Sequence, residues 1–79
     1  MAEEWIYIQW EKGSRYYEAR LHPDLWGCWV LTRIWGGKET QLGRIENFPC
    51  ASYQEGRKQL AIIQARRKRH GYKMVIAKN

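Results

Sequence analysis

Long hydrophobic runs are missing from this sequence. No segment approaches the roughly 18–20 consecutive apolar residues that a membrane-spanning helix requires. The acidic start M-A-E-E also lacks the basic region of a signal peptide. These absences predict a soluble, cytoplasmic protein that has no membrane partner.

Cysteine is scarce as well. Cys28 and Cys50 are the only two, and they lie 22 positions apart, outside any C-x-x-C motif. This spacing indicates neither a disulfide framework nor a zinc site. We therefore expect two buried, reduced thiols, no metal and no cofactor.

Residues with the spacing of a catalytic site are lacking too. His22, Asp24, Cys28 and His70 are the candidates of the usual catalytic types. No spacing among them resembles a metal site or a nucleophile with its base. We interpret His22 as a turn residue and His70 as part of a helix cap, and we expect no catalytic residues and no enzymatic activity.

Acidic residues are absent from the last part of the chain. Residues 57–79 carry eight Lys/Arg and no Asp or Glu, whereas residues 1–56 carry six Lys/Arg against eight acids. The net charge of +6 is therefore concentrated near one end of the chain. Such a local positive field is typical of proteins that bind a polyanion, usually a nucleic acid. The alternative is that the basic charge only keeps a small protein soluble.

Aromatic residues, in contrast, are abundant for a chain of 79 residues. A single domain of this size, here 1–79, buries little apolar surface and needs an efficient core. The five Trp and five Tyr can provide it, because each large ring buries roughly 150–250 Å².

Runs of β-branched and aromatic residues predict four strands, followed by a helix and a closing strand. We predict Gly43 as a bulge or twist point in the fourth strand. The segment S-Y-Q-E from Ser52 to Glu55 matches a capping box, and Gly71 provides a left-handed stop after a basic last turn. The thin apolar stripe of the helix consists of Tyr53, Leu60, Ala61, Ile63 and in part Ile62. The expected strands are 4–10, 15–22, 28–35, 40–48 and 72–76, and the expected helix is 53–70.

This order predicts an α+β fold, an antiparallel β-sheet of about five strands with one long helix packed on one face. In the second strand, alternation places Tyr17, Ala19 and Leu21 on the buried face. In the third strand, the face that carries Cys28, Val30 and Ile34 is the more uniformly apolar. We therefore predict that this face meets the core, and that Trp29, Arg33 and Trp35 lie on the less enclosed face.

The order of motifs resembles the WGR domain, a small module named for a Trp-Gly-Arg motif and found in poly(ADP-ribose) polymerases and in small bacterial proteins. The resemblance covers roughly residues 15–75 and rests on R-Y-Y-E-A-R-L, on L-W-G-C-W-V-L-T-R-I-W-G-G and on a basic helix end followed by G-Y. It implies a non-catalytic, DNA-binding module.

In the polymerases, the motif tryptophan packs on the sugar of a terminal nucleotide at a strand break. Trp35 matches that tryptophan and Gly36 the motif glycine, and Arg15 matches a position that is often close to phosphate. Position 37 departs from the family, because it is Gly where the motif has Arg. Lys38 or Arg44 would then have to supply the missing guanidinium's contact.

The candidate nucleic-acid-binding residues form two groups. The first surrounds an exposed ring at the rim of the sheet, where Gly36 and Gly37 let a ligand approach closely: Arg15, Arg33, Trp35, Gly36, Gly37, Lys38 and Arg44. The second lies at and after the helix end and is expected to follow phosphates, with about two of its four consecutive cations reaching one backbone: Arg66, Arg67, Lys68, Arg69 and Lys73.

Each group has an alternative interpretation. Trp35 can instead fold over Trp29 as a core residue, and the basic helix end can simply complement the helix dipole. The alternative function is a protein–protein interaction module that uses the sheet face and the aromatic rim. The expected partner is DNA, bound at ends or along the backbone with low sequence specificity, and the chain is expected to be a monomer or a weak dimer.

Overall fold

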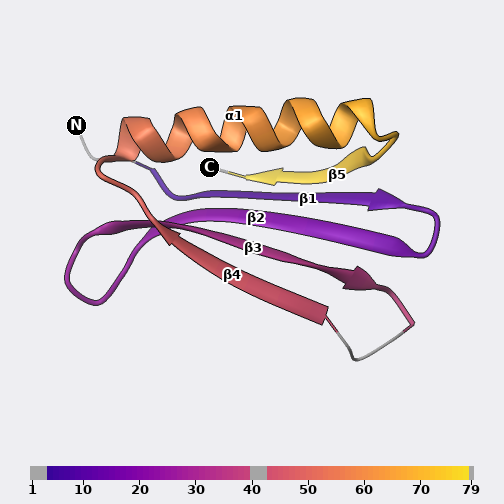
Figure 1. Ribbon diagram of the computed structural model, residues 1–79, viewed down its shortest axis with the longest axis horizontal. Coiled ribbons are helices and arrows are strands. Elements are labelled where there is room, and N and C mark those ends of the chain that lie inside the picture. Colours follow the sequence, from indigo (N-terminus) through magenta and orange to yellow (C-terminus); the bar gives the residue numbers. More distant parts are fainter. Residues whose placement is uncertain (1–3, 40–42, 79) are drawn as a thin grey trace.

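A computed structural model describes residues 4–39 and 43–78, which form a five-stranded sheet and one helix in the order ββββαβ (Figure 1). The predicted α+β class is confirmed. The elements are β1 (Ile6–Lys12), β2 (Arg15–Pro23), β3 (Trp29–Gly37), β4 (Gly43–Pro49), α1 (Tyr53–Arg69) and β5 (Lys73–Lys78).

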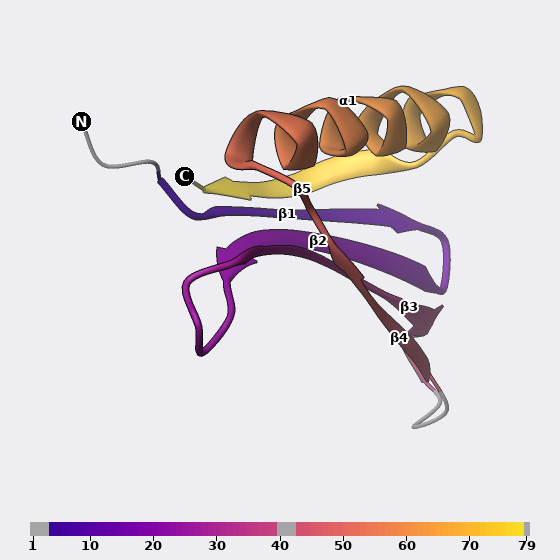
Figure 2. The ribbon, with the colours of Figure 1, turned by 60° about the vertical axis from the view of Figure 1, so that its left-hand side comes forward.

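The sheet is antiparallel at every strand pair and has the order β4-β3-β2-β1-β5. The chain crosses from β4 to the far edge through α1, which lies along one face of the sheet (Figure 2). The helix end and the turn between β1 and β2 therefore meet on the same side of the molecule. There the Lys12 side chain lies close to Gly71.

Several predicted boundaries shift. The β1–β2 turn contains only Gly13 and Ser14, and Gly13 has a φ of 57°, a left-handed conformation that favours glycine. The third strand continues through Gly37 instead of ending at residue 35. The predicted strand start at 40–42 lies outside the described residues.

Gly43 does not form the predicted bulge, because it continues the regular β3–β4 register opposite Gly36. A Cβ at Gly43 would come within 3.1 Å of the Tyr16 hydroxyl and 3.2 Å of the Trp35 carbonyl oxygen. Close approach of neighbouring groups thus accounts for the glycine. A shift in register occurs instead between Gln9 and Trp10, where β1 pairs with β5.

Both ends of α1 have the expected caps. The Ser52 hydroxyl accepts a hydrogen bond from the Glu55 backbone N–H at 3.1 Å. At the other end His70 is the C-cap, as predicted, and Gly71 has a φ of 84°. Gly71 N–H donates to the Lys68 carbonyl and Tyr72 N–H to that of Arg67, the two bonds of a Schellman motif.

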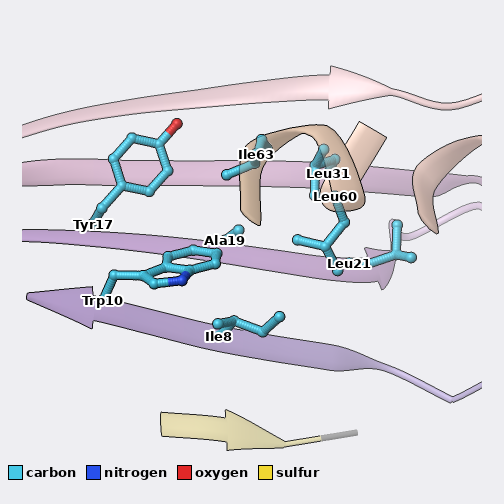
Figure 3. Close-up of a cluster of buried hydrophobic side chains, with 8 residues drawn as sticks. All are labelled: Ile8, Trp10, Tyr17, Ala19, Leu21, Leu31, Leu60 and Ile63. Carbon is cyan, nitrogen blue, oxygen red and sulfur yellow. The ribbon is translucent and has the colours of Figure 1, made fainter. Parts of the chain in front are cut away.

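The core lies between α1 and the central strands (Figure 3). Tyr17, Ala19 and Leu21 are buried, which confirms the predicted face of β2. In α1 only part of the predicted stripe is buried, since Ala61 and Ile62 are exposed. The core cluster comprises Ile8, Trp10, Tyr17, Ala19, Leu21, Leu31, Leu60 and Ile63.

The predicted orientation of β3 is wrong. Leu31 and Trp35 lie opposite Leu21 and Tyr17, so the face with Trp29, Arg33 and Trp35 is the one that meets the helix. The more uniformly apolar face, which carries Val30 and Ile34, lies on the side of the sheet away from the helix.

Side chains on that other face shield one another. Thr32 is buried there, and its hydroxyl donates to the Asn47 side-chain oxygen at 2.7 Å. His22 Nε2 lies 2.9 Å from the same hydroxyl. His22 is therefore a residue of β2 and not of a turn, and a polar network helps to enclose this face without a helix.

The thiols are reduced but not equally enclosed. Cys28 is exposed, which contradicts the predicted burial, and Cys50 is half-buried. Burial raises the pKa of the Cys50 thiol, so this group stays protonated more strongly than an ordinary cysteine. Within residues 4–39 and 43–78, no helix has the length and apolar character needed to cross a membrane.

Gly56 lies on the buried face of α1, against Leu21 of β2. An added Cβ would lie 2.4 Å from Leu21 Cδ1, and Leu21 is completely buried. The helix can therefore approach β2 because this position has no side chain.

We predict that Gly56→Val destabilises the fold by about 2 kcal/mol, because a branched side chain overpacks against a leucine that has little room to move. Urea unfolding would measure this loss. Ala61→Val is the matched control: it places valine at an exposed helix position and should cost less than about 1 kcal/mol. Valine is a better helix former than glycine, so helix propensity alone would not destabilise Gly56→Val. A loss in Gly56→Val no larger than that in Ala61→Val would contradict the claim that the approach of Gly56 to Leu21 leaves no room for a side chain.

Candidate nucleic-acid interface

A cleft of about 740 Å³ opens between the β1–β2 turn, the end of β3 and the C-terminal end of α1. It is the place where segments distant in sequence bring Trp35 and part of the basic helix end together. Its lining residues are Lys12, Gly13, Ser14, Arg15, Tyr17, Arg33, Trp35, Glu46, Arg67, His70 and Tyr72.

Stacked aromatic rings form one wall of this cleft. Tyr17 and Trp35 face each other across β2 and β3, with ring centroids 5.8 Å apart and planes within 14°. Tyr72 meets Tyr17 edge-on at 6.5 Å, and Trp10 does so at 5.9 Å from the core side. The site is thus a continuation of the core, and its rings have little freedom to reorient.

Trp35 is accordingly half-buried, and the prediction of an exposed ring is wrong. Its cross-strand neighbour Tyr17 covers one face of the indole. The alternative of packing over Trp29 does not describe it either, because Trp29 instead packs edge-on against Tyr53 at 4.7 Å.

Arg67 brings the helix end into the site. Its Cζ lies 4.3 Å from the Tyr17 ring centroid and 5.0 Å from that of Tyr72, which is within the range of cation–π attraction. Its Nε is buried and has no hydrogen-bond partner among the described residues. The guanidinium is therefore held by two rings and keeps unused donor capacity beside the cleft.

Arg33 is more strongly engaged. Its Nη2 donates to Glu46 at 2.6 Å and its Nη1 to the Tyr17 hydroxyl at 3.3 Å. Burial alone would lower the pKa of Arg33, but the bond to Glu46 and the nearby Tyr17 hydroxyl outweigh it and raise the pKa. The Arg33 charge is permanent, and Glu46 largely compensates it.

Lys12 lines the cleft where the β1–β2 turn meets the end of the helix. Its Nζ donates to the His70 carbonyl oxygen at 2.6 Å, which joins the β1–β2 turn to the helix C-terminus. A cation at this position also complements the partial negative charge of the last helical carbonyls.

The cleft has a clear excess of positive charge. Lys12, Arg15, Arg33 and Arg67 line it, and Glu46 is the single acid among its lining residues. Because Arg33 is paired with that acid, the cations that remain for a ligand are mainly Arg67, Lys12 and the exposed Arg15.

Four of the predicted residues thus meet in one site: Arg15, Arg33, Trp35 and Arg67. Gly36 and Gly37 lie in β3 opposite Tyr16 and Arg15, where they form its last two positions. Arg44 lies opposite Trp35 in β4, on the same face of the sheet.

The remaining predicted cations point elsewhere. Lys38 is ion-paired with Glu11 at 2.7 Å, and Lys73 lies opposite Glu11 in register, on the face away from Trp10. Arg66 lines a second cleft, together with Arg33, between α1 and β4. Arg69 is exposed on the helix. Adjacent helical residues diverge by about 100°, which is why the basic run does not converge on one site.

Seven lining residues were not proposed from the sequence as binding residues: Lys12, Gly13, Ser14, Tyr17, Glu46, His70 and Tyr72. The Y-Y and G-Y motifs that include Tyr17 and Tyr72 were a usable signal, since both carried the family resemblance. Lys12 and Glu46 gave none, because only the strand register brings them to the site.

No family model, curated protein or solved structure matches this chain. The WGR resemblance therefore stays a prediction, and the geometry of the cleft has to be judged by its own residues. Among the residues that the structure describes, no group of His, Cys, Asp and Glu has a metal-binding arrangement.

We predict that Arg67→Ala destabilises the protein by about 1–2 kcal/mol, because the guanidinium loses two aromatic partners in a partly buried position. Arg69→Ala, which removes the same charge from an exposed position two residues later, should change stability by less than about 0.5 kcal/mol. Thermal or urea unfolding of both variants measures the difference. Indistinguishable stabilities would show that the contacts of Arg67 with Tyr17 and Tyr72 contribute nothing.

Proposed function

We propose that this chain is a non-catalytic nucleic-acid-binding module that holds DNA at an end or along its backbone. The observation that carries the proposal is the cleft, which combines a rigid aromatic wall with an excess of cations. A sugar or base would pack against the accessible part of the Trp35 indole. Arg67, Arg15 and Lys12 would meet the adjacent phosphates.

The chemistry of the wall suits a nucleic acid better than a free anion. Stacking on an aromatic ring contributes about 1–3 kcal/mol per base and tolerates any base, because every base has a π-face. Phosphate pairing adds a term that depends on salt and not on sequence. Contacts to sugar and phosphate carry no direct sequence information, so the proposal implies low sequence specificity.

Arg67 is a candidate to replace the motif arginine that is absent at position 37. Arg67 extends from the helix to Tyr17, the ring that stacks on Trp35. The Arg33 guanidinium lies nearer to Trp35, 5.4 Å from its ring centroid, but is paired with Glu46. In this proposal the guanidinium that contacts phosphate therefore comes from α1. The sequence offered Lys38 and Arg44 as replacements for the motif arginine. Lys38 is already paired with Glu11, so it is the weaker of these two candidates.

We predict that Arg15→Gln lowers affinity for a short blunt-ended duplex and reduces the slope of log K against log salt by about 1, the effect of one lost phosphate contact. Arg15 is exposed, so the fold should tolerate the change. Lys58→Gln is the control, because this exposed lysine lies nine residues before Arg67, about two and a half turns, on the opposite side of the helix. Fluorescence anisotropy at several salt concentrations makes the measurement.

Two results would contradict the proposal: equal loss of affinity in Arg15→Gln and Lys58→Gln, or no measurable binding by the native chain at low salt. The same titration on a covalently closed circle of the same sequence separates end binding from backbone binding. Weaker binding to the circle supports recognition of ends, and equal binding supports recognition of the backbone alone.

One observation favours the second function, a protein-interaction module. In the loop between β2 and β3, Leu25 is 93% and Trp26 83% exposed. The loop is nevertheless ordered by Asp24, whose Oδ1 accepts from the backbone N–H of Trp26 and of Cys28. A fixed, exposed tryptophan is the residue type most often found as an anchor at protein interfaces.

Trp26→Ser separates the two functions. Because the ring is exposed, this variant should keep its free energy of unfolding within about 0.5 kcal/mol. The nucleic-acid proposal predicts unchanged affinity for the duplex. A loss of duplex affinity as large as that of Arg15→Gln would indicate that the duplex binds at this loop and not in the cleft.

A further inference from the structure

The strand β4 is an edge of the sheet, with β3 as its one partner in the strand order β4-β3-β2-β1-β5. It extends away from the helix, and no element of the described chain lies along its outer side (Figure 1, Figure 2). An edge of this kind presents unpaired backbone N–H and C=O groups to a further strand.

The register identifies these outward groups. Cys50 N–H donates to the Trp29 carbonyl at 2.8 Å, which fixes the alternation of the β3–β4 ladder. The backbones of residues 44, 46 and 48 then face β3, and those of Gly43, Ile45 and Asn47 face outward. Pro49 continues the outward series without an N–H, so the free edge is limited to 43–47.

The side chains of this segment are complementary to a second copy of themselves. If two β4 strands pair antiparallel with Ile45 opposite Ile45 of the other copy, Arg44 of each copy lies opposite Glu46 of the other. The outward groups of 43, 45 and 47 then all find partners. Registers centred on Arg44 or on Glu46 would instead place like charges opposite each other, which is unfavourable.

The exposed apolar surface agrees with this register. Ile45 is 63% exposed and lies opposite Ile34, on the face away from the helix. In the symmetric pair the two Ile45 side chains would meet at the two-fold axis and remove each other from water.

The opposite edge of the sheet lacks this complementarity. Strand β5 has Lys73 and Lys78 at its ends and no acid, so a second copy would be repelled. Charge of one sign on an edge strand is a common protection against pairing. The two edges therefore differ, and only β4 is suited to its own copy.

We propose that the chain forms a symmetric dimer through β4, which makes one continuous sheet across two copies. The occupant of the β4 edge is a second copy of this chain, aligned with Ile45 opposite Ile45. Each copy keeps its own cleft, because Glu46 is the one cleft-lining residue that β4 contributes and the others lie on β1 to β3, in the β1–β2 turn and at the helix end. The proposal does not depend on nucleic-acid binding.

Sedimentation velocity and native mass spectrometry of nucleic-acid-free protein test it, with a dimer expected at twice the chain mass of 9.5 kDa. Arg44→Glu should raise the dimer dissociation constant on the order of tenfold or more, because both cross-strand ion pairs become repulsive. Lys78→Glu makes the same charge change on the β5 edge and should leave the dissociation constant unchanged.

A mixing experiment gives the sharpest readout. Arg44→Glu and Glu46→Arg each place like charges opposite in their own homodimers, but together they restore both ion pairs. The 1:1 mixture should form a heterodimer more tightly than either variant associates with itself. Because Glu46→Arg also removes the partner of Arg33, its fold is checked by circular dichroism, and Asn47→Pro, which removes an outward N–H, provides an independent test.

A native chain that stays monomeric at every accessible concentration would overturn the proposal. So would a dimer that is insensitive to Arg44→Glu and Asn47→Pro, or one weakened equally by Lys78→Glu. Dimers seen only with DNA would also overturn it, since they would show that the nucleic acid joins the copies.

Discussion

The stack between Tyr17 and Trp35 is the contact on which the rest of this molecule depends. Tyr17 is 6% exposed. Its ring contacts Trp10 of β1, Trp35 of β3 and Tyr72, which follows the helix in the sequence. It also carries Arg67 over its ring. A single buried side chain thus joins the core to the wall of the cleft, so that the candidate site has the rigidity of the core.

The sheet topology supplies the other half of the site. Because β5 returns to the far side of β1, the chain must pass the β1–β2 turn on leaving the helix, and Lys12 donates there to the carbonyl oxygen of the C-cap residue His70. The Schellman motif at Gly71 then directs Tyr72 back toward Tyr17. The helix cap is a local feature of the sequence, but it places Tyr72 against Tyr17 of the distant strand β2.

The order of elements, both helix caps and the buried face of β2 could be predicted from the sequence, because each depends on neighbours along the chain. The orientation of β3 could not. Counting apolar residues favoured the side of Val30 and Ile34, but Arg33 is tolerated beneath the helix since Glu46 and the Tyr17 hydroxyl accept hydrogen bonds from its two Nη atoms. Trp35 was identified as a candidate but was expected to be exposed. Its burial depends on Tyr17, a cross-strand partner that strand periodicity alone cannot place.

The most direct test of the central claim, that the cleft receives nucleic acid, is a side-chain NMR titration of the ¹⁵N-labelled chain with a short blunt-ended duplex. The five tryptophan indole N–H groups report on separate places, with Trp35 in the cleft and Trp26 in the exposed loop. The account predicts that the Trp35 indole and the Arg67 Nε–H signals shift together as duplex is added, while the Trp26 indole stays unchanged. Shifts at Trp26 with none at Trp35 and Arg67 would contradict it.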